Sequence, residues 1–202
     1  MKIVLASNNA GKLREFSAAL APAGITMTAQ EAFGVTAIEE PFTTFVENAL
    51  AKARHAARET GLPALADDSG LCVPALQNAP GVYSSRYAAR AGKAHSDAAN
   101  NQHLLTQLKH ISERQAAYVV VLVFVETPDD ARPIIVEASW EGEIIEQPKG
   151  EHGFGYDPYF YLPHLEKTAA ELTPEQKNRC SHRGRALALL LDRLRERYDG
   201  KI

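Results

Sequence analysis

The spacing of apolar residues changes several times along the first part of the chain. Residues 1–6 form a short apolar run that is typical of a buried strand. Leu13, Phe16 and Leu20 then recur at helical spacing, and this helix is expected to stop near Pro22. The pattern therefore predicts that the chain opens with a strand, a loop and a helix.

A second helix is predicted to begin at Thr44, because Thr44 and Glu47 have the spacing of a capping box. Gly61 is expected to end it, since glycine is the usual residue just past the end of a helix. The apolar side of this helix consists of Val46, Ala49, Leu50, Ala53 and Ala57.

A strand and a long loop are predicted next. Leu65 and Ala66 indicate a short buried strand that ends at Asp67 and Asp68, with Gly70 permitting a sharp turn. Residues 78–95 contain glycine, proline and serine without any period, which favours a loop.

The second half of the chain predicts a helix, a hairpin and two closing helices. Ser96 caps the first of these helices, whose buried residues are expected to be Leu104, Leu105, Leu108 and Ile111. Residues 116–125 and 134–138 are expected to form an antiparallel hairpin, and residues 142–145 another strand. Helices are expected from Thr173 and Ser181, the last burying Leu187, Leu190, Leu191, Leu194 and Tyr198.

Early helices that alternate with strands, followed by a hairpin, predict an α/β fold with a mixed sheet flanked by helices. At 202 residues the chain is long enough for a sizeable core, and we expect residues 1–202 to form a single domain. The polar clusters fall at strand ends and in loops, where ligand clefts form in such sheets.

Composition and charge exclude several classes of protein. Lys and Arg total 22 against 25 acidic residues, so the net charge of −3 gives no general attraction for nucleic acid. The longest apolar run, residues 116–125, is about half the length of a membrane helix. The two cysteines lack metal-ligand spacing, and the opening apolar run after Lys2, IVLA, is too short for the core of a signal peptide. These features predict a cytoplasmic protein that binds neither nucleic acid nor membranes.

The sequence LASNNAGKLREF, residues 5–16, has the strand, loop and helix order of a phosphate-binding segment. It is not a Walker A loop, because Leu13 stands where that motif needs a hydroxyl group. Ser7, Asn8 and Asn9 could still form an anion site together with Lys12. A water-exposed lysine is the alternative, although a cation at a helix N-terminus opposes the helix dipole.

Asp67 and Asp68 are the most informative acidic pair. In a strand their side chains point to opposite faces, so that one can be structural while the other faces a cleft. Asp before Ser-Gly is also ordinary turn chemistry. Glu39 or Glu40 could add a second carboxylate, as a magnesium site would require, or could lie in a solvated loop.

Two later segments carry residues that could recognise a nucleobase. Residues 154–157, with the sequence FGYD, could stack on a base and accept hydrogen bonds, or could form a tight turn that packs Phe154 inside. Lys177, His182 and Arg183 lie around a predicted helix start and could donate to a carbonyl-rich ligand, or could form a solvated basic turn.

These segments, in this order, resemble the inosine/xanthosine triphosphate pyrophosphatase family, whose members hydrolyse nonstandard purine nucleotides. The likeness runs from LASNNAGKLREF through TFVENALAKARHAA, ALADDSGL, APGVYSSRYA and GFGYDPYF to KTAAELTPEQKNRCSHRGRAL. The resemblance implies a homodimer of α/β subunits, each with an elongated mixed sheet and a nucleotide cleft between two lobes. One departure is that many relatives have Thr-Gly-Asn where this chain has Ser7-Asn8-Asn9.

The resemblance also implies a role for each segment. Phosphates would be held by Ser7, Asn8, Asn9, Ala10, Gly11, Lys12 and Lys52. Glu40 and Asp68 would bind Mg²⁺, and Asp68 would also be the catalytic base, with Ser69 beside it. The base and ribose pocket would be formed by Phe154, Gly155, Tyr156, Asp157, Lys177, His182 and Arg183.

The expected reaction is attack of water on the α-phosphorus of ITP, dITP or XTP, which releases pyrophosphate and a nucleoside monophosphate. A phosphatase with an aspartyl-phosphate intermediate would need an aspartate after the first strand, where this chain has Ser7-Asn8-Asn9. A noncatalytic nucleotide sensor is the remaining alternative, since it would keep the pocket without needing the water-activating acid.

Overall fold

The computed structural model describes residues 1–198, and within this part of the chain eight strands form one mixed sheet. The strands are β1 (Lys2–Leu5), β2 (Thr26–Ala29), β3 (Ala64–Val73), β4 (Ala79–Pro80), β5 (Gln115–Val125), β6 (Ile134–Ile144), β7 (Phe160–Leu162) and β8 (Lys167–Thr168). Their order in the sheet is β2-β1-β3-β5-β6-β7-β8, and β4 pairs with β3. The prediction of a mixed α/β sheet is confirmed, since β1 lies parallel to β2 and β3 whereas β7 lies antiparallel to β6 and β8.

Most of the observed helices start and end close to the residues that the sequence predicted. They are α1 (Ala10–Leu20), α2 (Phe45–Thr60), α3 (Tyr87–Arg90), α4 (Asp97–Gln107), α5 (Pro174–Cys180) and α6 (His182–Arg197). Thr44 and Ser96 cap α2 and α4 as predicted, and Gly61 ends α2 with a φ of 66°.

The chain divides into two compact units, each of which we describe by itself. Unit 1 comprises residues 1–68 and 120–138 and the chain from Arg183 onward, and unit 2 comprises residues 69–119 and 139–182. The predicted single domain over residues 1–202 stays a prediction, and residues 199–202 lie outside the described part.

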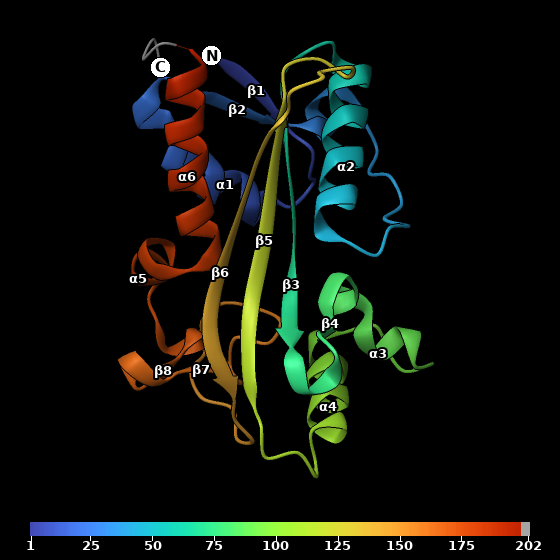
Figure 1. Ribbon diagram of the computed structural model, residues 1–202, viewed down its shortest axis with the longest axis vertical. Coiled ribbons are helices and arrows are strands. Elements are labelled where there is room, and N and C mark those ends of the chain that lie inside the picture. The colour runs from blue at the N-terminus through green and yellow to red at the C-terminus, as the bar shows by residue number, and fades with distance from the viewer. Residues whose placement is uncertain (199–202) are drawn as a thin grey trace. The chain divides into compact units, whose positions relative to one another are not determined.

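Unit 1 has helices on both faces of its part of the sheet. Alternate residues of β5 separate into two cores, with Val120, Leu122 and Phe124 in one and Val121, Val123 and Val125 in the other. The first core contains the apolar sides of α1 and α6, and the second contains the alanines of α2. Figure 1 accordingly shows α6 and α2 on opposite sides of β5. A strand that is buried on both faces must be apolar at nearly every position, as this one is.

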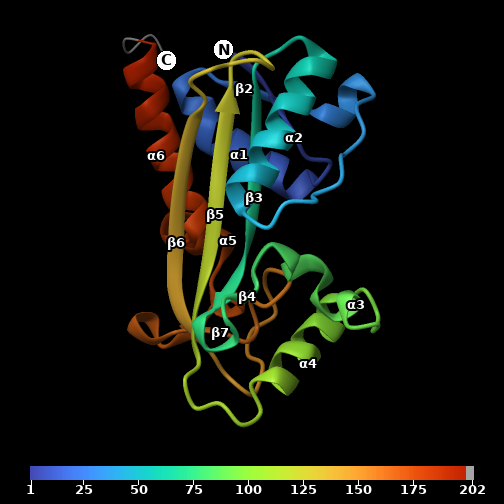
Figure 2. The same cartoon turned by 45° about the vertical axis from the view of Figure 1, so that its right-hand side comes forward.

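Unit 2 has its own core around Trp140 and Phe160, both fully buried, to which Leu104 and Leu108 contribute from α4 and the residue after it. Figure 2 shows α3 next to α4 in this unit. No helix among residues 1–198 is both long and apolar enough to cross a membrane.

Three local predictions are wrong, and a glycine explains the first of them. The strand predicted to end at Asp68 continues through Gly70 to Val73, and residues 134–145 contain one strand, β6, that runs through Gly142. A Cβ on Gly70 would lie 2.2 Å from the Gly81 oxygen, and one on Gly142 would lie 2.6 Å from the Tyr161 oxygen. Both glycines therefore permit a close backbone approach inside a strand, and Gly70 does not mark the predicted turn.

The third correction concerns residues 78–95, which were expected to be a long loop. They contain β4, a 3₁₀ helix at Gly81–Arg86, and α3. These elements are too short to show a regular spacing of apolar residues. The glycine, proline and serine residues between them therefore made the whole segment resemble a loop. Strands β2, β7 and β8, each of four residues or fewer, were not predicted either.

Candidate functional site

The side chains of β3 continue to alternate between the two faces of the sheet at Asp67 and Asp68. The two acidic side chains therefore contact different helices of unit 1. Leu65 belongs to the core that contains α1 and α6, whereas Ala66 belongs to the core that contains α2. Asp67 accordingly contacts Lys12 of α1, and Asp68 contacts Lys52 of α2. The prediction that the two aspartates have different surroundings follows directly from the strand geometry.

Asp67 is a buried carboxylate with cationic partners. Its side chain is 1% exposed, the Lys12 Nζ lies 3.0 and 2.9 Å from its two oxygens, and the Arg183 Nε lies 3.8 Å from Oδ2. Burial by itself raises the pKa of Asp67, but the charges of Lys12, Arg183 and Lys52 outweigh burial and lower it to about 2. Arg183 also lies 3.3 Å from Glu15. Asp67 therefore contacts both Lys12, which was expected to hold phosphate, and Arg183, which was expected to recognise the base.

Asp68 and Glu40 share one cation. The Lys52 Nζ lies 2.9 Å from Asp68 Oδ1 and 2.7 Å from Glu40 Oε1. Burial, with a contribution from Glu40, raises the pKa of the Asp68 carboxyl although Lys52 opposes this change. Burial lowers the pKa of Lys52, but the charges of the nearby carboxylates outweigh it and raise that pKa. The structure thus brings together the two carboxylates that were expected to bind metal.

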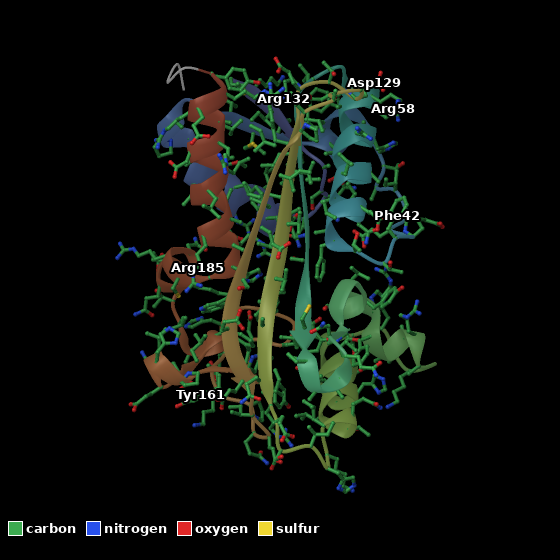
Figure 3. The ribbon with its side chains drawn as sticks, in the orientation of Figure 1. Phe42, Arg58, Asp129, Arg132, Tyr161 and Arg185 are labelled. Carbon is green, nitrogen blue, oxygen red and sulfur yellow. The ribbon has the colours of Figure 1, made fainter. Side chains whose placement is uncertain are left out.

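Asn48 is a contributor to this group that the sequence interpretation missed. Its side chain is almost fully buried, its Nδ2 donates to Asp68 Oδ2 at 3.3 Å, and the same amide bonds both the N–H and the carbonyl of Phe42. Figure 3 labels Phe42 in the segment that leads into α2. Asn48 therefore fixes both Asp68 and the segment that carries Glu40. The signal was its position four residues before Lys52, which places both residues on one side of α2.

The first loop and the start of α1 are arranged around Asn9. Its Oδ1 accepts hydrogen bonds from the N–H groups of Gly11 (2.8 Å) and Lys12 (3.1 Å), and its own N–H donates to Ser7 Oγ at 3.2 Å. Asn8 and Ala10 are exposed. The described non-glycine residues with positive φ are Gln77, Asn78 and Glu166, so the backbone at Asn8 does not need a glycine.

Asp157 of unit 2 organises the segment that was expected to recognise a base. It is 2% exposed, and its Oδ2 accepts from the Phe154 N–H at 2.9 Å and from Lys177 Nζ at 2.5 Å. Lys177 Nζ also lies 5.2 Å from the centre of the Phe154 ring, which is 59% exposed. The buried carboxylate thus holds the segment in shape, while the aromatic ring remains accessible for stacking.

The other residues expected at the base pocket lie in the same unit, apart from Arg183. Tyr156 is buried and its hydroxyl donates to the Ser84 oxygen at 2.8 Å. His182 is 4% exposed and stacks on Tyr118, with a centroid distance of 4.9 Å and 7° between the ring planes. Ser69 follows Asp68 in β3 and is partly buried.

The structure therefore groups the predicted residues in two sets. Unit 1 holds the phosphate and metal set, which comprises Ser7, Asn8, Asn9, Ala10, Gly11, Lys12, Glu40, Lys52 and Asp68, together with Arg183. Unit 2 holds Ser69, Phe154, Gly155, Tyr156, Asp157, Lys177 and His182. The expected cleft between two lobes stays a prediction.

Comparisons with known proteins agree on one family. Residues 3–193 match the model of the Ham1 family. A relative from Bordetella pertussis, named dITP/XTP pyrophosphatase, is 63% identical over 194 residues, which cover 96% of this chain and 91% of the relative. A relative of the same name from Burkholderia pseudomallei is 60% identical over 195 residues, covering 96% and 94% of the two chains. The solved structure of a HAM1 protein from Coxiella burnetii is similar with a TM-score of 0.91 and 50% identity, covering 97% of this chain and 99% of that one.

Proposed function

The chain belongs to the Ham1 family, and on this basis we propose that it hydrolyses nonstandard purine nucleoside triphosphates to the monophosphate and pyrophosphate. ITP, dITP and XTP are the proposed substrates. The single observation in the structure that supports this proposal best is the convergence of Glu40 and Asp68 on one cation, the ammonium group of Lys52.

Glu40 and Asp68 would hold the Mg²⁺ that this activity is proposed to need. Two carboxylates that already share a cation suit Mg²⁺, which commonly takes one or two protein carboxylates and completes its shell with water and substrate phosphates. When bound, the ion would neutralise charge on the phosphates and polarise the reacting phosphoryl group. Among the described residues there is no group of three or more histidine, cysteine, aspartate or glutamate side chains arranged to hold a metal.

Asp68 is the proposed general base. Its carboxylate would take a proton from the water that attacks the α-phosphorus, while the bond from that phosphorus to the departing pyrophosphate breaks. Lys12 and Lys52 would exchange part of their pairing with Asp67, Asp68 and Glu40 for contacts to phosphate oxygens. These cations stabilise the negative charge of the triphosphate and of the leaving group.

Recognition of the base is proposed for Phe154, Lys177, His182 and Arg183. The exposed ring of Phe154 offers a stacking surface, and the other three side chains carry hydrogen-bond donors. A 6-oxo purine such as hypoxanthine presents an acceptor at position 6, whereas adenine presents a donor that would be left facing another donor. This difference would select against ATP.

The protein is also proposed to act as a homodimer in the cytoplasm. Both proposals rest on its membership in the Ham1 family and on the cellular location of its proposed substrates, the free nucleotides. Sedimentation of the purified protein tests the dimer, and a single species with the mass of one chain would contradict it.

The test of the proposed function is a product assay with Mg²⁺ and a panel of triphosphates, using the wild type and Asp68→Asn. The wild type should release pyrophosphate from ITP, dITP and XTP, and much less from ATP. Asp68→Asn should lower turnover by a factor of about 10² to 10⁴, because it removes the base, while nucleotide binding persists. Orthophosphate as the first product would contradict the cleavage site, and binding without turnover by the wild type would indicate a sensor.

A further inference from the structure

Gly155 lies at the centre of the base-recognition segment and has a backbone that must be held by other residues. Its φ of 62° is in the left-handed region, and as a glycine it has no side chain to fix its position. The residues on either side of it are anchored by other groups: Asp157 Oδ2 accepts from the Phe154 N–H, and the Tyr156 hydroxyl donates to the Ser84 oxygen.

Both hydrogen-bonding groups of Gly155 are bound by one turn of α4. The Gly155 N–H donates to Asp97 Oδ2 at 2.8 Å, and the Gly155 carbonyl accepts from Asn101 Nδ2 at 2.8 Å. Asp97 and Asn101 are four residues apart and lie on the same side of the helix. The Asn101 Nδ2 also donates to the Asp97 carbonyl at 2.9 Å, so the amide is tied to its own helix while it reaches the glycine.

The environment of Asn101 indicates that this contact is specific. The residue is 7% exposed, and both groups that its Nδ2 contacts are carbonyls, which fixes the orientation of the amide. Its Oδ1 is buried without a hydrogen-bond partner among the described residues. An apolar side chain would avoid this unpaired acceptor, so packing alone does not account for an asparagine at this position.

We propose that Asp97 and Asn101 are positioning residues that hold the peptide of Gly155 and thereby place the Phe154 ring for stacking on the purine base. The side chains of the pair bond the two backbone groups of Gly155, so the pair acts through the backbone next to Phe154. This inference rests on the proposed function. Its energetic logic is preorganisation, because a segment already held in its binding conformation loses less entropy when the base binds.

Steady-state kinetics with dITP would separate this role from a general effect on stability. Asn101→Ala and Asp97→Ala should each raise KM, by about tenfold for Asn101→Ala and by less for the exposed Asp97, while kcat stays within about twofold. Asp97→Asn keeps an oxygen acceptor for the Gly155 N–H and should restore most of the affinity. Because Asp97 is exposed, its variants test the proposal even if Asn101→Ala folds poorly.

Ser96→Ala is the matched control. Ser96 caps α4 through the Ala99 N–H and has no bond to Gly155, so its loss should destabilise the same helix without changing KM. Hydrogen exchange gives a second readout, since the Gly155 amide should exchange faster in Asp97→Ala than in Ser96→Ala.

The outcomes distinguish this inference from the proposed function. If the wild type hydrolyses dITP and the alanine variants keep its KM, the inference is wrong and the proposed function is unaffected. If the wild type hydrolyses none of the nonstandard triphosphates, the proposed function fails. The inference is then tested by comparing the affinity of the wild type and of the alanine variants for inosine. Unchanged inosine affinity in both alanine variants would overturn it.

Discussion

Asp67 and Asp68 are adjacent buried residues whose carboxyl pKa values shift in opposite directions. Cationic partners lower the pKa of Asp67 despite its burial, whereas burial prevails at Asp68 and raises its pKa. A carboxylate that stays ionised at almost any pH suits a structural role between Lys12 and Arg183. Asp68, which pairs with Lys52 beside Glu40, is instead the residue for which the metal-binding and general-base roles are proposed.

Asp67 should make the stability of the protein depend on pH in the acid range. Its pKa falls from an ordinary value of 3.8 to about 2 in the folded chain, so its ionised form stabilises the fold above pH 4. This contribution, about 2 kcal/mol, should be lost as the pH falls from about 4 to about 2. Urea unfolding at several pH values would measure it.

Asp67→Asn is the comparison for that measurement, because it keeps the size of the side chain and removes the titration. Other carboxylates also titrate in this range, so the informative quantity is the difference in unfolding free energy between the two proteins. The difference should shrink as the pH falls below 4. A difference that is constant from pH 7 to pH 2 would show that Asp67 is not stabilised by its ionic partners.

At the level of elements, the sequence patterns predicted helix starts and strand burial, which depend on nearby residues. They missed strand boundaries that depend on contacts with distant parts of the chain. The starts of α2 and α4 follow from capping residues, and the two-sided burial of β5 follows from its continuous apolar run. Gly70 was interpreted as a turn residue because the backbone that approaches it, at Gly81, comes from another part of the chain. Short strands such as β8 leave no periodic signal at all.

The same distinction holds for the candidate site. The residue pattern indicated Asp68 and Glu39 or Glu40 as acids near strand and helix ends, and only the family resemblance added Lys52. The structure places Glu40, Lys52 and Asp68 together. The pairing of Lys12 with Asp67 was not predicted, because the sequence does not show which helix packs on the face of β3 to which Asp67 points. The contact of Asn101 with Gly155 joins positions 54 residues apart and has no local signal.

Gly70→Ala should strongly destabilise unit 2. The added Cβ would lie 2.2 Å from the Gly81 oxygen and 2.6 Å from Ser84 Oγ, so β3 and the segment after β4 would have to separate. We expect a loss of about 3 kcal/mol or more in unfolding free energy, measured in urea, because a backbone oxygen cannot move aside as a flexible side chain can.

Ser84→Ala provides the control for this prediction. By itself it removes the Oγ that accepts from the Leu71 N–H at 2.8 Å, and it should cost about 1 kcal/mol. Combined with Gly70→Ala it removes one of the two clashes but leaves the Gly81 oxygen in place. The double variant should therefore be no more stable than Gly70→Ala, and recovery of stability would show that the serine was the only obstacle.

At the level of the whole molecule, the division into two units does not follow the chain. The boundaries fall between Asp68 and Ser69, Val119 and Val120, Ala138 and Ser139, and His182 and Arg183. Three of these boundaries lie inside β3, β5 and β6, and the fourth lies in the first turn of α6. Neither unit is a continuous segment that could be released by cutting the chain once, which supports the proposal of one folding domain.

This connectivity leads us to predict that the two units unfold in one transition. Trp140 is the only tryptophan of the sequence and is fully buried in unit 2, so its fluorescence reports on that unit. The longest helices, α2 and α6, lie wholly or almost wholly in unit 1, so circular dichroism at helical wavelengths is weighted toward unit 1. The two signals should give the same urea midpoint, because a strand that loses its hydrogen bonds in one unit removes the template for its continuation in the other. Two separate midpoints would instead mean that the boundaries inside β3, β5 and β6 act as hinges between independently stable domains.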